Sequence, residues 1–187
     1  MIVLALDLDI VSFILFIGVS LLIYVYRNPK REITVLKKDS VLSPVDGKVI
    51  SIKNINNTEY SYKIEIDSKF SNIGILRTPI AGTVVNIEIL HGAMLSDNTP
   101  LSKKINEFSS IIIKDENLNS IKVEHLSKLS FEPISIDVHC EQKLACGARY
   151  GFMMNGITTI YMPKDSQINL SVGDDIIASK TVIGDFA

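Results

Sequence analysis

The sequence contains no tryptophan, two cysteines and three histidines in 187 residues. Cys140 and Cys146 are separated by five residues, with His139 alongside. A metal site needs more ligands than these at tighter spacing, so we expect no metal. Too few cysteines are present for a disulfide framework, and we predict that both are ordinary buried thiols in a reducing compartment.

A surplus of either charge is also missing. The 19 Lys and Arg residues are dispersed along the chain and are outnumbered by 21 Asp and Glu residues, for a formal net charge of -2. A nucleic-acid binder would show a clustered basic surface, so we expect no nucleic-acid partner. Hydrophobic residues make up 47% of the chain, which is enough for one ordinary core and a membrane segment.

The longest uncharged segment runs from Ile10 to Tyr26. Its seventeen residues are at the lower limit of what crosses a hydrocarbon core of about 30 Å as a helix. The basic residues that follow are Arg27, Lys30, Arg31, Lys37 and Lys38. Since a cleaved signal peptide carries its positive charge before the apolar run, we predict an uncleaved membrane anchor over residues 1–27, spanning or re-entrant. A cationic linker over 28–40 then places the remaining chain on the cytoplasmic side.

Two turn sequences in the chain are related. Leu42–Val49 reads Leu-Ser-Pro-Val-Asp-Gly-Lys-Val, and Arg77–Val84 reads Arg-Thr-Pro-Ile-Ala-Gly-Thr-Val. Each has Pro after a hydroxyl residue and Gly before a β-branched run, which is typical of a sharp turn that enters a strand. The chemical difference between them is that Asp46 in the first is replaced by Ala81 in the second.

Short segments rich in Ile and Val recur through the remaining chain, separated by turn residues. Besides the segments that begin at Val49 and Val84, the predicted strands are Tyr62–Ile66, Ile73–Leu76, Ser110–Ile113, Ser120–Val123, Ile134–Val138, Thr158–Met162 and Gln167–Leu170. A second loose repeat relates Glu141–Gly151 to Gly173–Gly184. We predict a mainly β fold over residues 41–187: a barrel-sandwich-like domain of short strands with pseudo-symmetric repeats and little helix, preceded by one N-terminal membrane helix.

Four motifs, in order, resemble the short form of the phosphatidylserine decarboxylase family. They are Tyr26-Arg-Asn-Pro-Lys-Arg31, the two turn sequences, and Gly147-Ala-Arg-Tyr-Gly151. The resemblance implies a proenzyme that cuts itself before the Ser of a Gly-Ser motif. That Ser becomes a pyruvoyl group, an electron sink that forms a Schiff base with the substrate amine. An Asp and a His of the family are candidates for assisting the Ser.

The family's catalytic residues match only in part. Asp46 coincides with the family Asp, although an Asx turn would explain it equally well. Gly74 stands in the place of the His, and Ile157 in the place of the Ser. The segment from there to Pro163 is one residue shorter than in the family, so the Ser was either replaced by Ile157 or deleted, which leaves Thr158 as the nearest hydroxyl.

These departures leave three hypotheses. The first, which the sequence favours, is a catalytically degenerate homologue in phospholipid metabolism that binds phospholipid or regulates a partner. The second is an active decarboxylase, converting phosphatidylserine to phosphatidylethanolamine, that cleaves itself unusually at Thr158. The third is a structural membrane-anchored β domain with a protein partner.

Ile157 cannot form a pyruvoyl group, because the acyl shift needs a hydroxyl or thiol nucleophile. We therefore expect no cofactor, and the balance of the residues is against an enzyme. The expected partners are a phospholipid membrane, phosphatidylserine or a related lipid, and a second copy of the chain or a catalytic paralogue. His125 and His139 are interpreted as ordinary histidines of the β domain.

Overall fold

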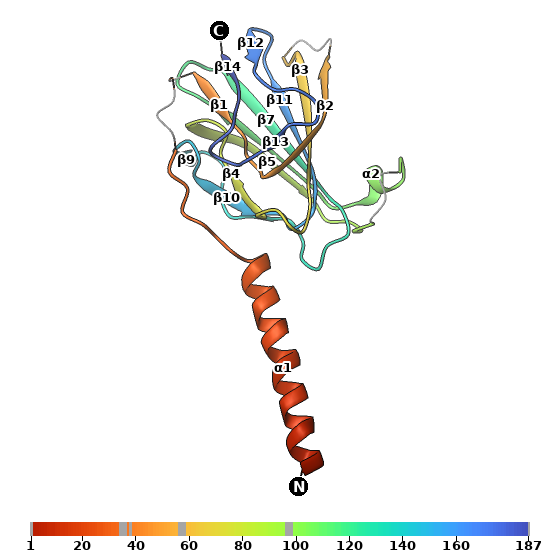
Figure 1. Cartoon of the computed structure of the whole chain (residues 1–187). Helices are drawn as coiled ribbons and strands as arrows, with labels where there is room; N and C mark the ends of the chain where they lie inside the picture. Colours follow the sequence, from red (N-terminus) through yellow and green to blue (C-terminus); the bar gives the residue numbers. More distant parts are fainter. Residues whose placement is uncertain (1, 34–36, 38, 56–58, 96–98, 187) are drawn as a thin grey trace.

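The chain forms one long N-terminal helix and a β domain (Figure 1). The computed structural model describes residues 2–33, 37, 39–55, 59–95 and 99–186, with only the backbone described for residues 2–9. Residues 34–36 and Lys38 of the predicted linker lie outside these residues. Helix α1 (Ile2–Val25) ends just before Asn28-Pro29, as expected because Pro restricts the residue before it and donates no backbone hydrogen bond.

Antiparallel strands make up the β domain, and the described residues contain fourteen of them in three sheets. In spatial order, the eight-stranded sheet consists of β13 (Asp175–Ile176), β2 (Gly47–Asn54), β3 (Tyr62–Ser68), β11 (Gly156–Met162), β7 (Ser120–Ser127), β6 (Phe108–Lys114), β5 (Gly82–Leu90) and β9 (Lys143–Leu144). One three-stranded sheet consists of β1 (Ser40–Leu42), β14 (Val182–Phe186) and β12 (Ser166–Ile168). The other consists of β4 (Ile75–Arg77), β10 (Arg149–Phe152) and β8 (Ser135–Ile136).

The prediction of a mainly β domain of short strands is confirmed. Apart from α1, the described residues contain one other helix, the single turn α2 (Ser102–Ile105). The sheets stay open, because among the described residues the edge strands β13 and β9 each pair with one neighbour and not with each other. The domain is therefore not a closed barrel.

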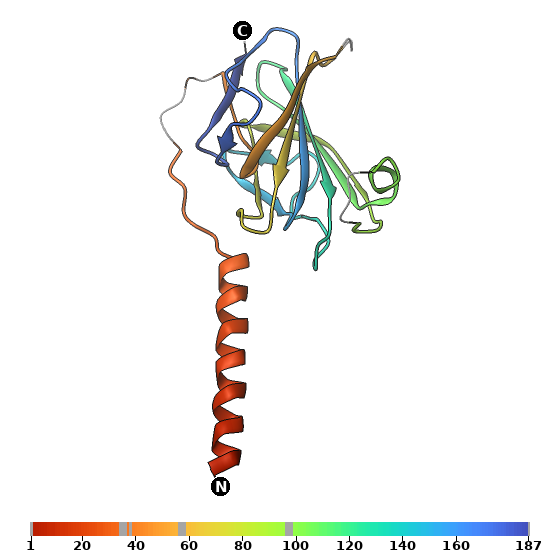
Figure 2. The same ribbon diagram turned by 45° about the vertical axis from the view of Figure 1, so that its right-hand side comes forward.

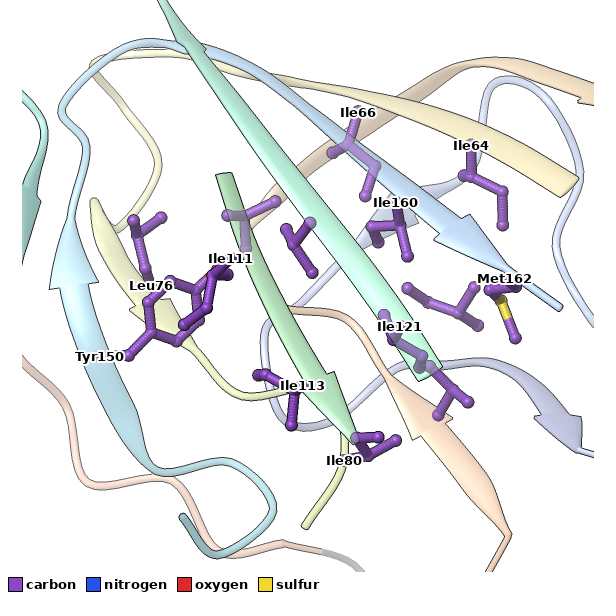
Figure 3. Packing of buried hydrophobic residues seen from close by; sticks show 14 of the residues in the cluster. Ile64, Ile66, Leu76, Ile80, Ile111, Ile113, Ile121, Tyr150, Ile160 and Met162 are labelled. Atoms are coloured by element: carbon purple, nitrogen blue, oxygen red, sulfur yellow. The ribbon is translucent and has the colours of Figure 1, made fainter. Parts of the chain in front are cut away.

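The core lies between the sheets and is built from branched apolar side chains. Along each central strand alternate residues face inward, which is the period of two that the sequence predicts. Figure 3 shows the inward side chains Ile64, Ile66, Ile111, Ile113, Ile121, Ile160 and Met162, together with Leu76 and Tyr150 from the neighbouring sheet. All nine are fully buried, so they anchor β11 in the middle of the domain.

The two related turns exchange equivalent hydrogen bonds. The Leu42 backbone N–H donates to the Pro79 carbonyl, and the Arg77 backbone N–H donates to the Pro44 carbonyl, each at 2.9 Å. The second repeat pairs with the first in the same way, because β13 lies against the start of β2 and β9 against the start of β5. The internal repeats are thus a structural pairing of the two halves.

The predicted membrane-spanning anchor over residues 1–27 is not supported. Helix α1 projects away from the β domain (Figure 2), but among the described residues no helix is long and apolar enough to cross a membrane. The uncharged part of α1 covers Ile10–Val25, and its sixteen residues rise only about 24 Å, against a hydrocarbon core of about 30 Å.

Both cysteines are free, and the prediction of buried thiols is wrong for one of them. Cys140 is exposed and Cys146 is half-buried. Cys140 lies in the turn before β9, where a short polar connection keeps the backbone at the surface.

Candidate functional site

Asp46 lies in the turn between β1 and β2, and two partners hold its carboxylate. The Arg31 guanidinium donates to both carboxylate oxygens, with Nη1–Oδ1 and Nη2–Oδ2 distances of 2.6 Å. The Ala178 backbone N–H donates to Oδ1 at 2.8 Å, and Arg31 also donates to the Ala178 carbonyl at 2.7 Å. The Arg31 and Asp46 side chains are only 6% and 11% exposed. These bonds tie the segment after α1 to the turn after β13.

Two further arginines lie near this ion pair. Arg77, at the end of β4, is buried and donates to the Gly147 carbonyl at 3.0 Å. Burial lowers the pKa of the Arg77 guanidinium, the charges of Arg31 and Arg149 lower it further, and Asp46 opposes them. Three guanidinium groups near one carboxylate make this region cationic, with donors of the kind that bind phosphate or carboxylate.

Ile157 and Thr158 lie in β11, in the middle of the eight-stranded sheet, and their side chains point to opposite faces. Strand β11 pairs with β3 and β7 through both residues. Ile157 lines a shallow groove of about 190 Å³, and its side chain is mostly buried there. Thr158 points to the other face and is fully buried. The peptide bond between them therefore belongs to a continuous central strand.

Thr158 begins a chain of buried hydrogen bonds. Its Oγ1 lies 2.9 Å from His125 Nδ1, and His125 Nε2 lies 2.7 Å from the Tyr150 hydroxyl. All three residues are completely buried. The sequence does not predict this contact, since His125 is interpreted there as an ordinary histidine of the β domain. The sequence does contain one indication that His125 is buried. Residues along β7 alternate between the two faces of the sheet, and this places His125 on the same inward face as Val123.

The buried chain is neutral at physiological pH. Burial lowers the pKa of His125 to about 3 and raises the pKa of the Tyr150 hydroxyl. A neutral imidazole has one N–H donor and one acceptor nitrogen, so it can accept a hydrogen bond from Thr158 while donating to Tyr150, or the reverse. In either tautomer the imidazole is a weak base, because it binds a proton only in strong acid.

Asp46 does not join this chain. Its backbone carbonyl accepts a hydrogen bond from Ser68 Oγ at 2.6 Å, and Ser68 pairs with Gly156 across the β3–β11 ladder. Strand β3 therefore lies between Asp46 and Gly156. Its carboxylate is bonded to Arg31 and Ala178.

Comparison with known proteins identifies the family. A protein-family model described as phosphatidylserine decarboxylase matches residues 20–184. The chain belongs to this family. Three relatives that it resembles are each named phosphatidylserine decarboxylase proenzyme. The relative from Nitrosomonas europaea is 25% identical, and the match covers 86% of this chain and 76% of the relative. The relative from Desulfotalea psychrophila is 26% identical, and the match covers 95% of this chain and 85% of the relative. The relative from Burkholderia ambifaria is also 26% identical, and the match covers 86% of this chain and 76% of the relative.

At the two positions that the motif spacing predicts for the family's serine and histidine, the residues of this chain do not fit the family's pyruvoyl group. Ile157, which the motif spacing predicts at the family's serine position, has a hydrocarbon side chain that cannot become a keto acyl group. At Gly74, which the motif spacing predicts at the family's histidine position, a Cβ atom would lie 2.6 Å from the Phe152 ring and 2.8 Å from the Met153 carbonyl oxygen. The packing around residue 74 thus leaves no room for an imidazole.

Arg31 is the other residue whose contact the sequence did not predict. It belongs to the Tyr26–Arg31 motif of the family resemblance, but the motif gives no partner for it. The contact depends on the path of the chain after Pro29, which brings Arg31 back to the turn at Asp46. A charged residue just after an apolar helix is usually exposed, so its burial could not be read from position alone.

Proposed function

We propose that this chain is a non-processing member of the phosphatidylserine decarboxylase family that binds phospholipid at a membrane. The observation that carries the proposal is Ile157, an apolar and mostly buried side chain at the position of the family's serine. Without a hydroxyl or thiol there, the chain has no nucleophile at the family's cleavage position.

The engaged carboxylate of Asp46 supports this proposal. A group that assists proton transfer needs a free acceptor oxygen within reach of the reacting proton. The Arg31 guanidinium occupies both oxygens of Asp46, and Arg31 is almost fully buried with it. The pair therefore acts as a structural tie in this chain.

Two features support phospholipid as the ligand. In the cationic region, Arg149 is exposed and offers a guanidinium donor for a phosphate or carboxylate headgroup, while the buried charge of Arg77 lies beside it. The outward side chains of α1 are apolar and exposed, among them Phe13 and Phe16. Such a surface leaves water when α1 inserts into lipid, and the basic residues after it favour a β domain on the cytoplasmic side.

Vesicle sedimentation combined with a product assay tests the proposal. The full chain is mixed with vesicles of equal parts phosphatidylcholine and phosphatidylserine, and both the bound protein and any phosphatidylethanolamine are measured. We expect binding without product. Phe16→Asp should reduce binding, because it places a charge on the apolar surface of α1, whereas Leu118→Asp on the β6–β7 turn should not. Formation of phosphatidylethanolamine would contradict the proposal.

The 2.9 Å contact between Thr158 Oγ1 and His125 favours a second candidate, self-cleavage at Thr158. Attack of Oγ1 on the Ile157 carbonyl carbon would form an ester, and elimination would release a chain ending in the Ile157 carboxylate. Hydrolysis of the resulting enamine would free ammonia and leave a 2-oxobutanoyl group on the second chain. Under this candidate Thr158→Val abolishes a fragment that the unaltered protein produces, and Thr158→Ser retains it.

The weak basicity of His125 and the branched side chain of Ile157 both oppose this second route. The attacked carbonyl would also belong to a central strand paired on both sides.

A second copy of the chain or a catalytic paralogue stays a prediction for the protein partner. Size-exclusion chromatography of the full chain alone measures self-association, and the same experiment with a decarboxylase from the same cell measures binding to a paralogue.

A further inference from the structure

The loop between β7 and β8, residues 128–134, ends in an uncovered aromatic side chain. Phe131 is 88% exposed, the most exposed of the large apolar side chains that the structure describes, and Leu129 in the same loop is 50% exposed. The Phe131 ring lies 6.0 Å from the ring of Phe70, which belongs to the turn after β3. The two loops together therefore present apolar surface to solvent.

The end of α1 is fixed to both loops. The Tyr26 hydroxyl donates to Glu132 Oε2 at 2.6 Å, and its ring stacks on Phe152 with centroids 5.5 Å apart. The Arg27 guanidinium donates to the Ser71 carbonyl at 2.5 Å. These contacts hold Phe131 next to the point where α1 leaves the β domain, and Figures 1 and 2 both show the loop after β7 on that side of the domain.

We infer that this loop is a second membrane contact beside α1, with Phe131 inserted at the headgroup level of an anionic lipid surface. The inference rests on the proposed membrane attachment and adds a contact made by the β domain itself. It would further restrain how the domain stands on the membrane, in addition to the contacts that hold the end of α1 against the two loops.

Charge and residue type favour lipid over a protein partner. The segments 26–30, 67–72 and 128–134 carry four basic and two acidic residues, a net charge of +2, in a chain whose formal net charge is -2. Basic residues near the surface attract the anionic headgroups of a membrane. Aromatic side chains such as Tyr24, Tyr26 and Phe131 are those that settle at the boundary between water and lipid.

The absence of tryptophan from the chain allows a direct test. Phe131→Trp introduces a single fluorophore at the loop tip, and Leu118→Trp introduces a matched one at the opposite end of β7, where Leu118 is 79% exposed. Each full-length variant is titrated with vesicles of equal parts phosphatidylcholine and phosphatidylserine, some of them containing brominated lipid. Sedimentation of the same samples measures binding.

We expect the Phe131→Trp emission to shift to shorter wavelength and to be quenched by brominated lipid, while Leu118→Trp changes in neither respect. Phe131→Ser should weaken vesicle binding about tenfold, since an exposed aromatic side chain gains roughly that factor on partial burial, and Leu118→Ser should leave binding unchanged. An unchanged Phe131→Trp spectrum in protein that sediments with vesicles would overturn the inference and leave the proposed attachment intact.

Two other outcomes would also overturn it. A blue shift that appears without lipid and grows with protein concentration would assign the loop to contact between copies of the chain. Failure of the unaltered protein to sediment with vesicles would reject both this contact and the proposed attachment through α1.

Discussion

The buried ion pair of Arg31 and Asp46 makes a prediction at the scale of single residues. Arg31→Met leaves the Asp46 carboxylate buried without its counter-charge, so we expect the free energy of unfolding to fall by about 3 kcal/mol. Lys63→Met is the control, because it breaks the more exposed pair with Glu65 and should cost less than about 1 kcal/mol. Urea unfolding measures both, and equal losses would show that the Arg31 pair is no more than a surface contact.

His125 makes a second prediction at this scale, about pH. Its pKa is about 3 in the folded chain against 6.5 in the unfolded chain, so between these values the unfolded state binds more protons. Its contribution to stability is present above pH 6.5 and is lost as pH falls toward 3, with a slope on the order of 1 kcal/mol per pH unit.

The control is the His125→Gln variant, because the glutamine side chain does not titrate. We expect its free energy of unfolding to fall less steeply between pH 6.5 and 4.5 than that of the unaltered protein. Unfolding midpoints in urea across that range compare the two proteins. Identical slopes would mean that the imidazole gains a proton without unfolding, and that the chain Thr158–His125–Tyr150 is open to water.

At the scale of elements, the two related turns make the third prediction. A Cβ atom on Gly47 would lie 2.5 Å from the Asp67 carbonyl oxygen, and one on Gly82 would lie 2.3 Å from the Lys114 carbonyl oxygen. Since both neighbours are backbone atoms of the paired strand, Gly47→Ala and Gly82→Ala should each destabilise the domain by more than about 1 kcal/mol. A Cβ atom on Gly18 in α1 would have nothing within 4 Å, so Gly18→Ala should not lower the free energy of unfolding. Unchanged midpoints for both turn variants would mean that the turns are not structurally equivalent.

The longer elements could be predicted from the sequence because each contains enough residues to show a period. β2, β3, β5, β6, β7 and β11 all have seven or more residues, and each was predicted in place to within a few residues. β9 and β13 have two residues each, which is too short for any alternation, and they exist because they pair with the starts of β5 and β2. The repeat was visible in the sequence, but this pairing was not.

The candidate site also contains residues that have a local sequence signal and contacts that have none. The roles of Asp46, Gly74 and Ile157 stay predictions from motif spacing, made because each lies in a local sequence that resembles the family. The contacts of Thr158 with His125 and of Asp46 with Arg31 depend on strand register and on the path of the chain after Pro29. Residues that meet only through tertiary structure leave no local signal, which is why both partners were missed.

At the scale of the whole molecule, we propose a β domain that lacks the family's nucleophile at Ile157 and that contacts lipid through α1 and the loop at Phe131. The α1 helix, the loop at Phe131 and the cationic region around Arg77 all involve segments near the place where α1 leaves the domain. Under the proposed function, this arrangement binds phospholipid without carrying out the family's reaction.

Intact-mass spectrometry of the purified full-length protein tests the central claim most directly. The absence of a nucleophile at Ile157 predicts one species with the mass of the uncut 187-residue chain, before and after prolonged incubation with phosphatidylserine vesicles. Two fragments, the second beginning at Thr158 and carrying a keto acyl group in place of its amino terminus, would contradict the account and establish self-cleavage.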